Sequence, residues 1–225
     1  MVELLNTIIP NVMSKPDLLW KAFIETCQML VFTAPISFVL GLALGVTVVA
    51  TKPGGVLENR WVYLMVGKVI DLFRSIPFIL LAIIMLGLSR LIVGVGIGVK
   101  GAIIPLLFGT VPFFARQVET AMAEVSPGLI EAAQSMGCSP GDILWRVCLK
   151  ESVPGIIRGG TITLVSLIGF TAMAGAIGAG GLGNFAIAYG TRNQMDVAYV
   201  VIIIILVMIS LIQAIGNRIA QRATH

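Results

Sequence analysis

The sequence has few charged residues. Only 12% of its 225 residues are charged, whereas a soluble domain carries roughly 25%, so too few charges remain to cover the surface of an ordinary soluble enzyme. The mean hydropathy is +1.00 and 57% of the residues are hydrophobic, which excludes a disordered chain because disorder needs low hydrophobicity and high net charge. The composition therefore favours a membrane protein.

Groups that would support catalysis, a metal site or nucleic-acid binding are also scarce. Cys27, Cys138 and Cys148 form an odd set without metal-type spacing, so they predict no disulfide framework. The single histidine is His225, the last residue, and we expect neither a metal site nor a catalytic triad. The sequence has no G-x-x-x-x-G-K-[ST] phosphate loop, so we expect no ATP site or cofactor in this chain. The net charge of +4 comes without a basic run, which argues against nucleic acid as a partner.

Long uncharged runs predict helices that cross a lipid bilayer, since one crossing needs about 20 apolar residues. Residues 26–51, 159–191 and 197–217 are such runs, and two shorter runs at 75–89 and 101–115 would recruit flanking charged turns. The expected fold is an all-α integral membrane protein with five transmembrane helices, at about 26–51, 62–88, 101–122, 159–180 and 197–217. The glycine-rich stretch 91–99 is too short to span and is expected to be a loop or an interfacial segment.

Lysine and arginine positions predict the orientation. If the loop after the first span is cytoplasmic, 10 basic residues lie inside and 5 outside, which favours an external N-terminus and a cytoplasmic C-terminus. The domain organisation is then an external segment 1–19, a transmembrane domain 20–218 and a cytoplasmic tail 219–225. The single long polar loop, 123–158, falls on the cytoplasmic side between the third and fourth spans.

This polar loop predicts two short capped helices. The start and stop signals are Ser126 with Pro127, Gly137, and then Ser139 with Pro140 and Asp142. The first helix carries small side chains, which would let a partner surface approach closely, so it is a candidate docking helix. The alternative is a helix that lies flat on the membrane or on its own bundle.

Two further sets of residues are candidates for the transport pathway. Lys68, Asp71 and Arg74 share one helical face, so Asp71 can reach both cations, and Arg116 with Glu119 repeats the pattern. The cluster is either the end of a helix that extends into water or a charged group beside a pathway.

The fourth span carries small residues at intervals of four, such as Ala172 and Ala176, with bulky Met173 among them. Small residues favour close helix packing or leave room beside a pore, and Met173 is either a packed side chain or a gate. Glycines 178, 180, 181 and 183 are expected to break this helix.

At the polar loop the sequence resembles a known family. Glu131-Ala132-Ala133, with Gly137 six residues after the glutamate, resembles the EAA motif of ABC importer permeases. Lys150 stands where that motif usually has a proline, so the second helix could instead end at Pro154. Further segments are similar to the methionine-importer branch of the family, namely Phe73–Ile79, Pro112–Arg116, Gly178–Gly183 and the ending Ala223–His225.

The resemblance implies a permease subunit of the bacterial inner membrane that has no ATPase site of its own. It implies a complex with a second copy of the chain, two cytoplasmic ATPases that bind ATP, and an external substrate-binding lipoprotein, with methionine as substrate. The ATPase-coupling residues that it implies are Leu129, Ile130, Glu131, Ala132, Ala133 and Gly137. Alternatives are a permease for another small amino acid or organic solute, an ion-coupled secondary transporter, or a structural subunit. A secondary transporter is expected to contain inverted repeats. Five spans cannot be divided into two equal halves, which argues against that alternative.

Overall fold

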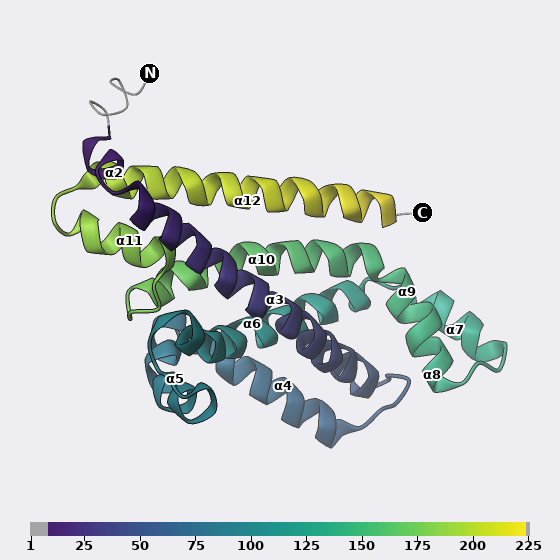
Figure 1. Ribbon diagram of the computed structural model, residues 1–225. Coiled ribbons are helices and arrows are strands. Elements are labelled where there is room, and N and C mark those ends of the chain that lie inside the picture. The colour runs from purple at the N-terminus through teal and green to yellow at the C-terminus, as the bar shows by residue number, and fades with distance from the viewer. Residues whose placement is uncertain (1–8, 224–225) are drawn as a thin grey trace. The chain divides into compact units, whose positions relative to one another are not determined.

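A computed structural model describes residues 9–223, and over these residues its regular secondary structure is entirely helical (Figure 1). The elements are α2 (Pro10–Met13), α3 (Pro16–Thr51), α4 (Arg60–Ser75), α5 (Phe78–Val93), α6 (Gly98–Ala123), α7 (Pro127–Ser135), α8 (Pro140–Asp142), the π-helical turn η1 (Ile143–Cys148), α9 (Leu149–Glu151), α10 (Val153–Gly175), α11 (Gly181–Gly190) and α12 (Met195–Ala223).

The chain forms two compact units, and the long helices contribute residues to both. The first unit takes Pro77–Gly109, Leu164–Ile212 and the described residues up to Pro35. The second takes Ile36–Ile76, Thr110–Thr163 and the described residues from Gln213 onward. Each unit has its own core. In the first unit, buried residues of α3, α11 and α12 pack together around Leu182, Phe185 and Val197, and in the second, α3 and α6 pack on the polar-loop helices.

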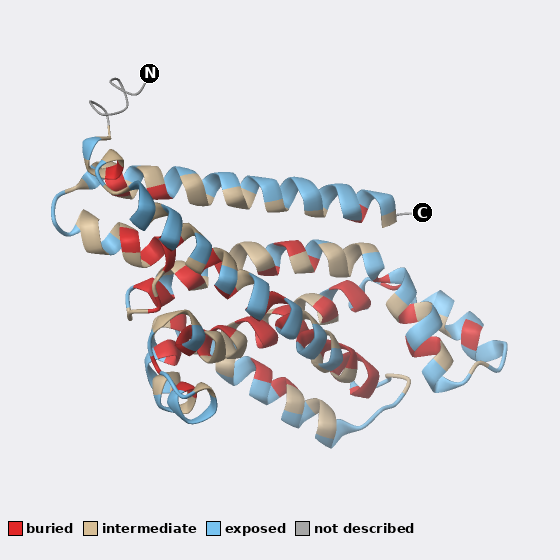
Figure 2. Ribbon diagram, in the orientation of Figure 1, coloured by how far each residue is buried: buried red, intermediate tan, exposed pale blue. Residues whose placement is uncertain are grey.

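Four of the described helices are long and apolar enough to cross a bilayer: α3, α6, α10 and α12. The pair α4 and α5 would supply a fifth crossing if the two count as one broken span. Figure 2 shows α12 with few buried residues and much exposed surface along its length, and its exposed residues include Ile203, Leu206 and Leu211. Such a continuous apolar surface is unfavourable in water and fits contact with lipid or with other apolar protein surface.

The predicted second span at 62–88 is not a single helix. α4 ends at Ser75 and α5 begins at Phe78, and the two helices are joined at a sharp bend. Ile76 and Pro77 between them have extended backbone, with ψ of 125° and 131°. Proline disfavours helical geometry in the residue before it and has no N–H to donate, so the helix ends there.

Other boundaries also differ from the prediction. α3 begins at Pro16 rather than near residue 26, and the predicted loop 91–99 shrinks to four residues because α5 continues to Val93 and α6 begins at Gly98. The predicted break after the fourth span is present, although α10 ends before residue 180 and Gly183 lies within α11. α10 ends at Gly175, and Gly178, Gly180 and Gly181 follow with φ of +88°, +82° and +77°.

Some predictions fall on parts of the chain that the structure does not describe. The predicted terminal segments 1–19 and 219–225 are described only from residue 9 and up to residue 223. His225, and with it most of the ending that resembles methionine permeases, lies outside the described residues.

Candidate functional site

The helix α7 begins where the sequence predicts. Ser126 is the N-cap residue and Pro127 is the first helical residue, where a missing N–H leaves no hydrogen bond unmade. The Ser126 side chain makes no capping hydrogen bond, although its carbonyl accepts from the Leu129 N–H at 3.1 Å. The proline and the backbone geometry, more than the serine hydroxyl, therefore start this helix.

The end of α7 is held by Gly137, as the sequence predicts. Gly137 has φ of +77°, and its N–H donates to the Gln134 carbonyl at 2.9 Å, while the Cys138 N–H donates to the Ala133 carbonyl at 3.1 Å. This pair of bonds is the Schellman arrangement, which satisfies carbonyls at the helix end and needs a left-handed residue. The turn reverses the chain directly toward the second polar-loop helix.

The second helix of the loop is also capped as predicted. The Ser139 hydroxyl accepts from the Asp142 N–H at 3.2 Å and donates to the Asp142 carboxylate at 2.6 Å. The helix does not end at Lys150, and its end lies three residues before Pro154. The helical path continues through Lys150 to Glu151, and Pro154 lies in the first turn of α10, where proline is tolerated.

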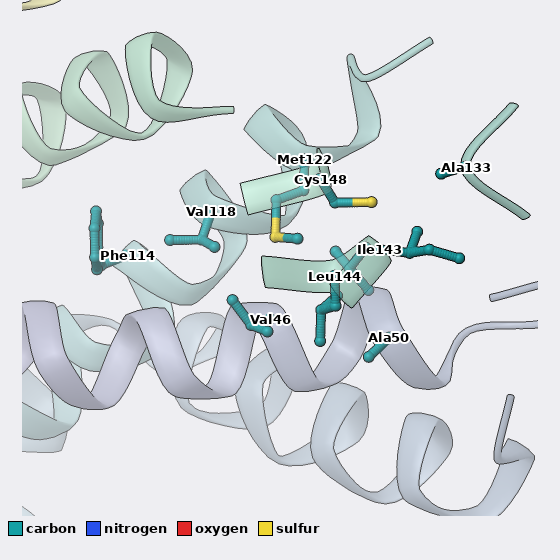
Figure 3. Packing of buried hydrophobic residues seen from close by; sticks show 10 residues of the cluster. Val46, Ala50, Phe114, Val118, Met122, Ala133, Ile143, Leu144 and Cys148 are labelled. Carbon is teal, nitrogen blue, oxygen red and sulfur yellow. The ribbon is translucent and has the colours of Figure 1, made fainter. Parts of the chain in front are cut away.

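The π-helical turn η1, which directly follows the Ser139 and Asp142 cap, was not predicted from the sequence. Ile143, Leu144 and Cys148 are buried in η1, and the wider turn places residues five apart on one face. Figure 3 shows these side chains together with Ala133 of α7, Met122 of α6 and Ala50 of α3. The predicted docking helix is thus fixed to the ends of two membrane helices through an apolar core. In the sequence, the adjacent apolar pair Ile143-Leu144 is the only sign of this apolar core.

The face of α7 that points away from this apolar core is exposed. Ala133 is 3% exposed, whereas Glu131 and Ala132 are exposed and Leu129 is 45% exposed. Met136, which follows the helix, is 76% exposed. A helix with one face anchored and an apolar and acidic face left open has the form of a docking element.

A pocket of about 420 Å³ lies beside α7, within the second unit. Lys52, Met122, Glu131, Gln134 and Cys148 are among its lining residues. Burial raises the pKa of the Cys148 thiol and the nearby Lys52 ammonium opposes this rise, so the thiol stays protonated near neutral pH and is a poor nucleophile.

The predicted charge cluster is present in a different arrangement. Asp71 lies 3.9 Å from Arg74, as expected, but its shorter ion pair is with Arg116, at 2.8 Å. Among the described residues no ion pair joins Asp71 to Lys68. Arg116 also pairs with Glu119 and donates to the Gly67 carbonyl at 3.3 Å. The network therefore joins α4 to α6 through Arg116, which the sequence placed in a separate pattern.

The predicted pathway residues lie at the end of α10. Met173 is 41% exposed, Ala176 is exposed and Ala172 is half-buried. The neighbouring residues Thr171 and Ala174 are buried, so Met173 is on the open face of the helix. Within the single chain, Met173 is not packed into a core.

These observations define a class of protein: a helical membrane permease that presents an anchored helix from its single long polar loop. The family profile of the binding-protein-dependent transport system inner membrane component matches residues 37–225. The chain belongs to this family.

Relatives across bacteria support the assignment. The chain is 41% identical over 221 residues to the probable D-methionine transport system permease protein MetI of Vibrio cholerae, covering 98% of both chains. It is 43% identical to the methionine import system permease protein MetP of Bacillus subtilis, covering 90% of this chain and 92% of the relative.

A solved structure has the same fold. One chain of the MetNI methionine ABC transporter in an inward-facing conformation matches with a TM-score of 0.91 and 40% identity, over 94% of this chain and 99% of that chain. A chain of an amino acid ABC transporter matches with a TM-score of 0.79 at 16% identity, which shows shared fold alone.

Proposed function

We propose that this chain is the permease subunit of an ATP-driven importer that moves methionine across the bacterial inner membrane. The observation that carries this function is the 40% identity and TM-score of 0.91, over nearly the whole chain, to a chain of a methionine ABC transporter. The family to which the chain belongs works with binding proteins. The chain supplies the path through the membrane, and a separate subunit hydrolyses ATP.

The partners are a second copy of the chain, two cytoplasmic ATPases and an external substrate-binding lipoprotein. The open face of α7, with Leu129, Glu131 and Ala132, supports ATPase docking because its other face is fixed to α3 and α6 through the apolar core. Movement of the ATPases would then reach the membrane helices through a rigid connection.

Met173, with Ala172 and Ala176, is assigned to the translocation pathway. The exposure of Met173 in the single chain supports this role, because a side chain that merely fills a core would be buried. A long, flexible thioether can close a narrow passage and move aside during transport.

Reconstitution of the complex in proteoliposomes tests the function. Permease, ATPase and binding protein together should accumulate labelled methionine only with ATP. Competition with unlabelled amino acids of other classes separates methionine from another small solute. Uptake driven by an ion gradient without ATP would contradict the proposal and favour a secondary transporter.

A further inference from the structure

Two neighbouring side chains of α3 hold the first turn of α11. The Glu25 carboxylate accepts a hydrogen bond from the Gly181 N–H at 2.8 Å, and the buried Thr26 hydroxyl accepts one from the Leu182 N–H at 2.9 Å. These two donors are among the first N–H groups of α11, which have no partner within their own helix. All four residues belong to the first unit.

The backbone at this contact leaves room for the Glu25 carboxylate. A Cβ atom on Gly180 would lie 2.5 Å from Glu25 Oε2, and one on Gly181 would lie 2.8 Å from Thr26 Oγ1. Both glycines have left-handed φ, at +82° and +77°. A side chain at either position would be strained by the left-handed backbone, and at Gly180 it would also displace the Glu25 carboxylate, so glycine suits this contact.

The same glycines separate α10 from α11. α10 ends at Gly175 and α11 begins at Gly181. Between residues 178 and 181, three of the four residues have positive φ: Gly178, Gly180 and Gly181. Glycine changes φ and ψ with little steric cost. The connection can therefore act as a hinge, and the two hydrogen bonds fix one of its positions.

Glu25 is an ionisable residue at the edge of the uncharged run that is expected to cross the membrane. Glu25 directly precedes the uncharged run 26–51, and its side chain is 25% exposed. Its cationic neighbour, Lys21, lies 4.0 Å away and is mostly solvated. A hydroxyl such as that of Thr26 would satisfy an N–H group without a charge, and ionisable residues at membrane depth are commonly functional.

We propose that Glu25 and Thr26 form a releasable clamp on the start of α11, and that the clamp opens and closes during the ATP-driven cycle. They are positioning residues: they act on the transport path through the glycine hinge that follows Met173. The proposal rests on the proposed function, since it needs an ATP-driven cycle in which the clamp is closed in one state and open in another.

Hydrogen exchange at the Gly181 and Leu182 amides tests the clamp directly. The complex of permease and ATPase is measured without nucleotide and after trapping with ATP and vanadate. In one of the two states the Gly181 amide should exchange about tenfold or more faster, because it loses a hydrogen bond to a carboxylate, and the Leu182 amide should exchange severalfold faster, because its acceptor is a neutral hydroxyl. Equal protection in both states would overturn the proposal.

Variants separate a clamp from a structural cap. Glu25→Ala combined with Thr26→Val should make exchange fast in both states and raise ATP hydrolysis in the absence of binding protein severalfold, with the melting temperature kept. Thr26→Ser should restore the wild-type ratio of stimulated to basal hydrolysis, and Glu25→Gln should keep part of the protection because its amide oxygen still accepts. A glutamine variant that behaves like alanine would contradict the clamp.

Two matched controls come from the same helix. Asp17→Ala removes an exposed acidic residue from the first turn of α3, and Thr47→Val removes a hydroxyl that donates to the Ala43 carbonyl one turn earlier. Both should leave exchange at residues 181 and 182 unchanged. If the Glu25 and Thr26 variants lower the melting temperature and transport together at a constant hydrolysis ratio, the contact is a static cap. Failure of the wild-type complex to transport methionine would instead count against the proposed function, because the exchange measurement does not depend on the substrate.

Discussion

Gly137 and Ser126 differ in how much of their role follows from residue type. A left-handed residue is needed at the end of α7, and glycine adopts φ of +77° without a steric penalty. The sequence therefore predicts Gly137 correctly. Ser126 occupies its predicted position, yet its hydroxyl makes no bond to the helix. A cap can thus be located from sequence, whereas the bond that its side chain makes depends on a rotamer that the sequence does not determine.

Gly137→Ala should destabilise the end of α7. A side chain in left-handed geometry costs about 1–2 kcal/mol, and the two bonds to the Ala133 and Gln134 carbonyls would weaken. We expect reduced co-purification of the ATPase with normal membrane insertion, measured by affinity pull-down from detergent. Gly141→Ala is the control, since Gly141 lies in the same loop without positive φ. Equal loss of ATPase in both variants would show that the turn at Gly137 is not the cause.

Met173→Ala separates a pathway role from packing. A buried methionine cut to alanine costs roughly 2–5 kcal/mol, but Met173 is 41% exposed, so the melting temperature of the purified complex should fall little. Basal ATP hydrolysis or substrate leak should rise, because the passage loses its plug. Leu167→Ala, on the same helix and fully buried, should show the reverse: a lower melting temperature with hydrolysis still coupled. If Met173→Ala also melts early and stays coupled, Met173 is a packing residue.

Helices of this chain are predicted from sequence to different degrees. Caps and uncharged runs indicate α7 and the long helices, because those signals are local. The bend at Pro77 is missed because a span estimated from uncharged runs ignores backbone geometry. Asp71 and Arg116 are far apart in the sequence, so only the packing of α4 on α6 reveals their pairing. The π-helical turn follows from the need to bury Ile143 and Cys148 together, which is a tertiary demand.

The exposed face of α7 gives a prediction about coupling. Glu131→Lys reverses a charge on that face and leaves the buried Ala133 untouched. Like charges brought together at an interface cost several kcal/mol, so ATPase association should weaken roughly tenfold or more, measured by co-purification and ATP-driven uptake. Ser135→Lys adds a cation at an exposed position of the same helix and serves as the control. Wild-type association in Glu131→Lys would remove this residue from the docking surface.

The number of times the chain crosses the membrane depends on the bent pair α4 and α5. Each has 16 residues, and a 16-residue helix is about 24 Å long, whereas the hydrocarbon core is about 30 Å thick. Neither helix spans alone. If the pair crosses as one broken span, residue 95 lies on the opposite side from residue 58; if the pair is re-entrant, both lie on the same side.

Single cysteines in a background without Cys27, Cys138 and Cys148 distinguish these topologies. The sites are exposed residues at Ser14, Glu58, Val95 and Ser135. With five crossings and an external N-terminus, an impermeant thiol reagent should label Ser14→Cys and Val95→Cys on intact spheroplasts, and label Glu58→Cys and Ser135→Cys only after permeabilisation. Normal methionine uptake by each variant is the control for folding. Labelling of Val95→Cys only after permeabilisation would make α4 and α5 a re-entrant loop. The chain would then cross twice between Ser14 and Ser135, and both sites would be labelled from the same side.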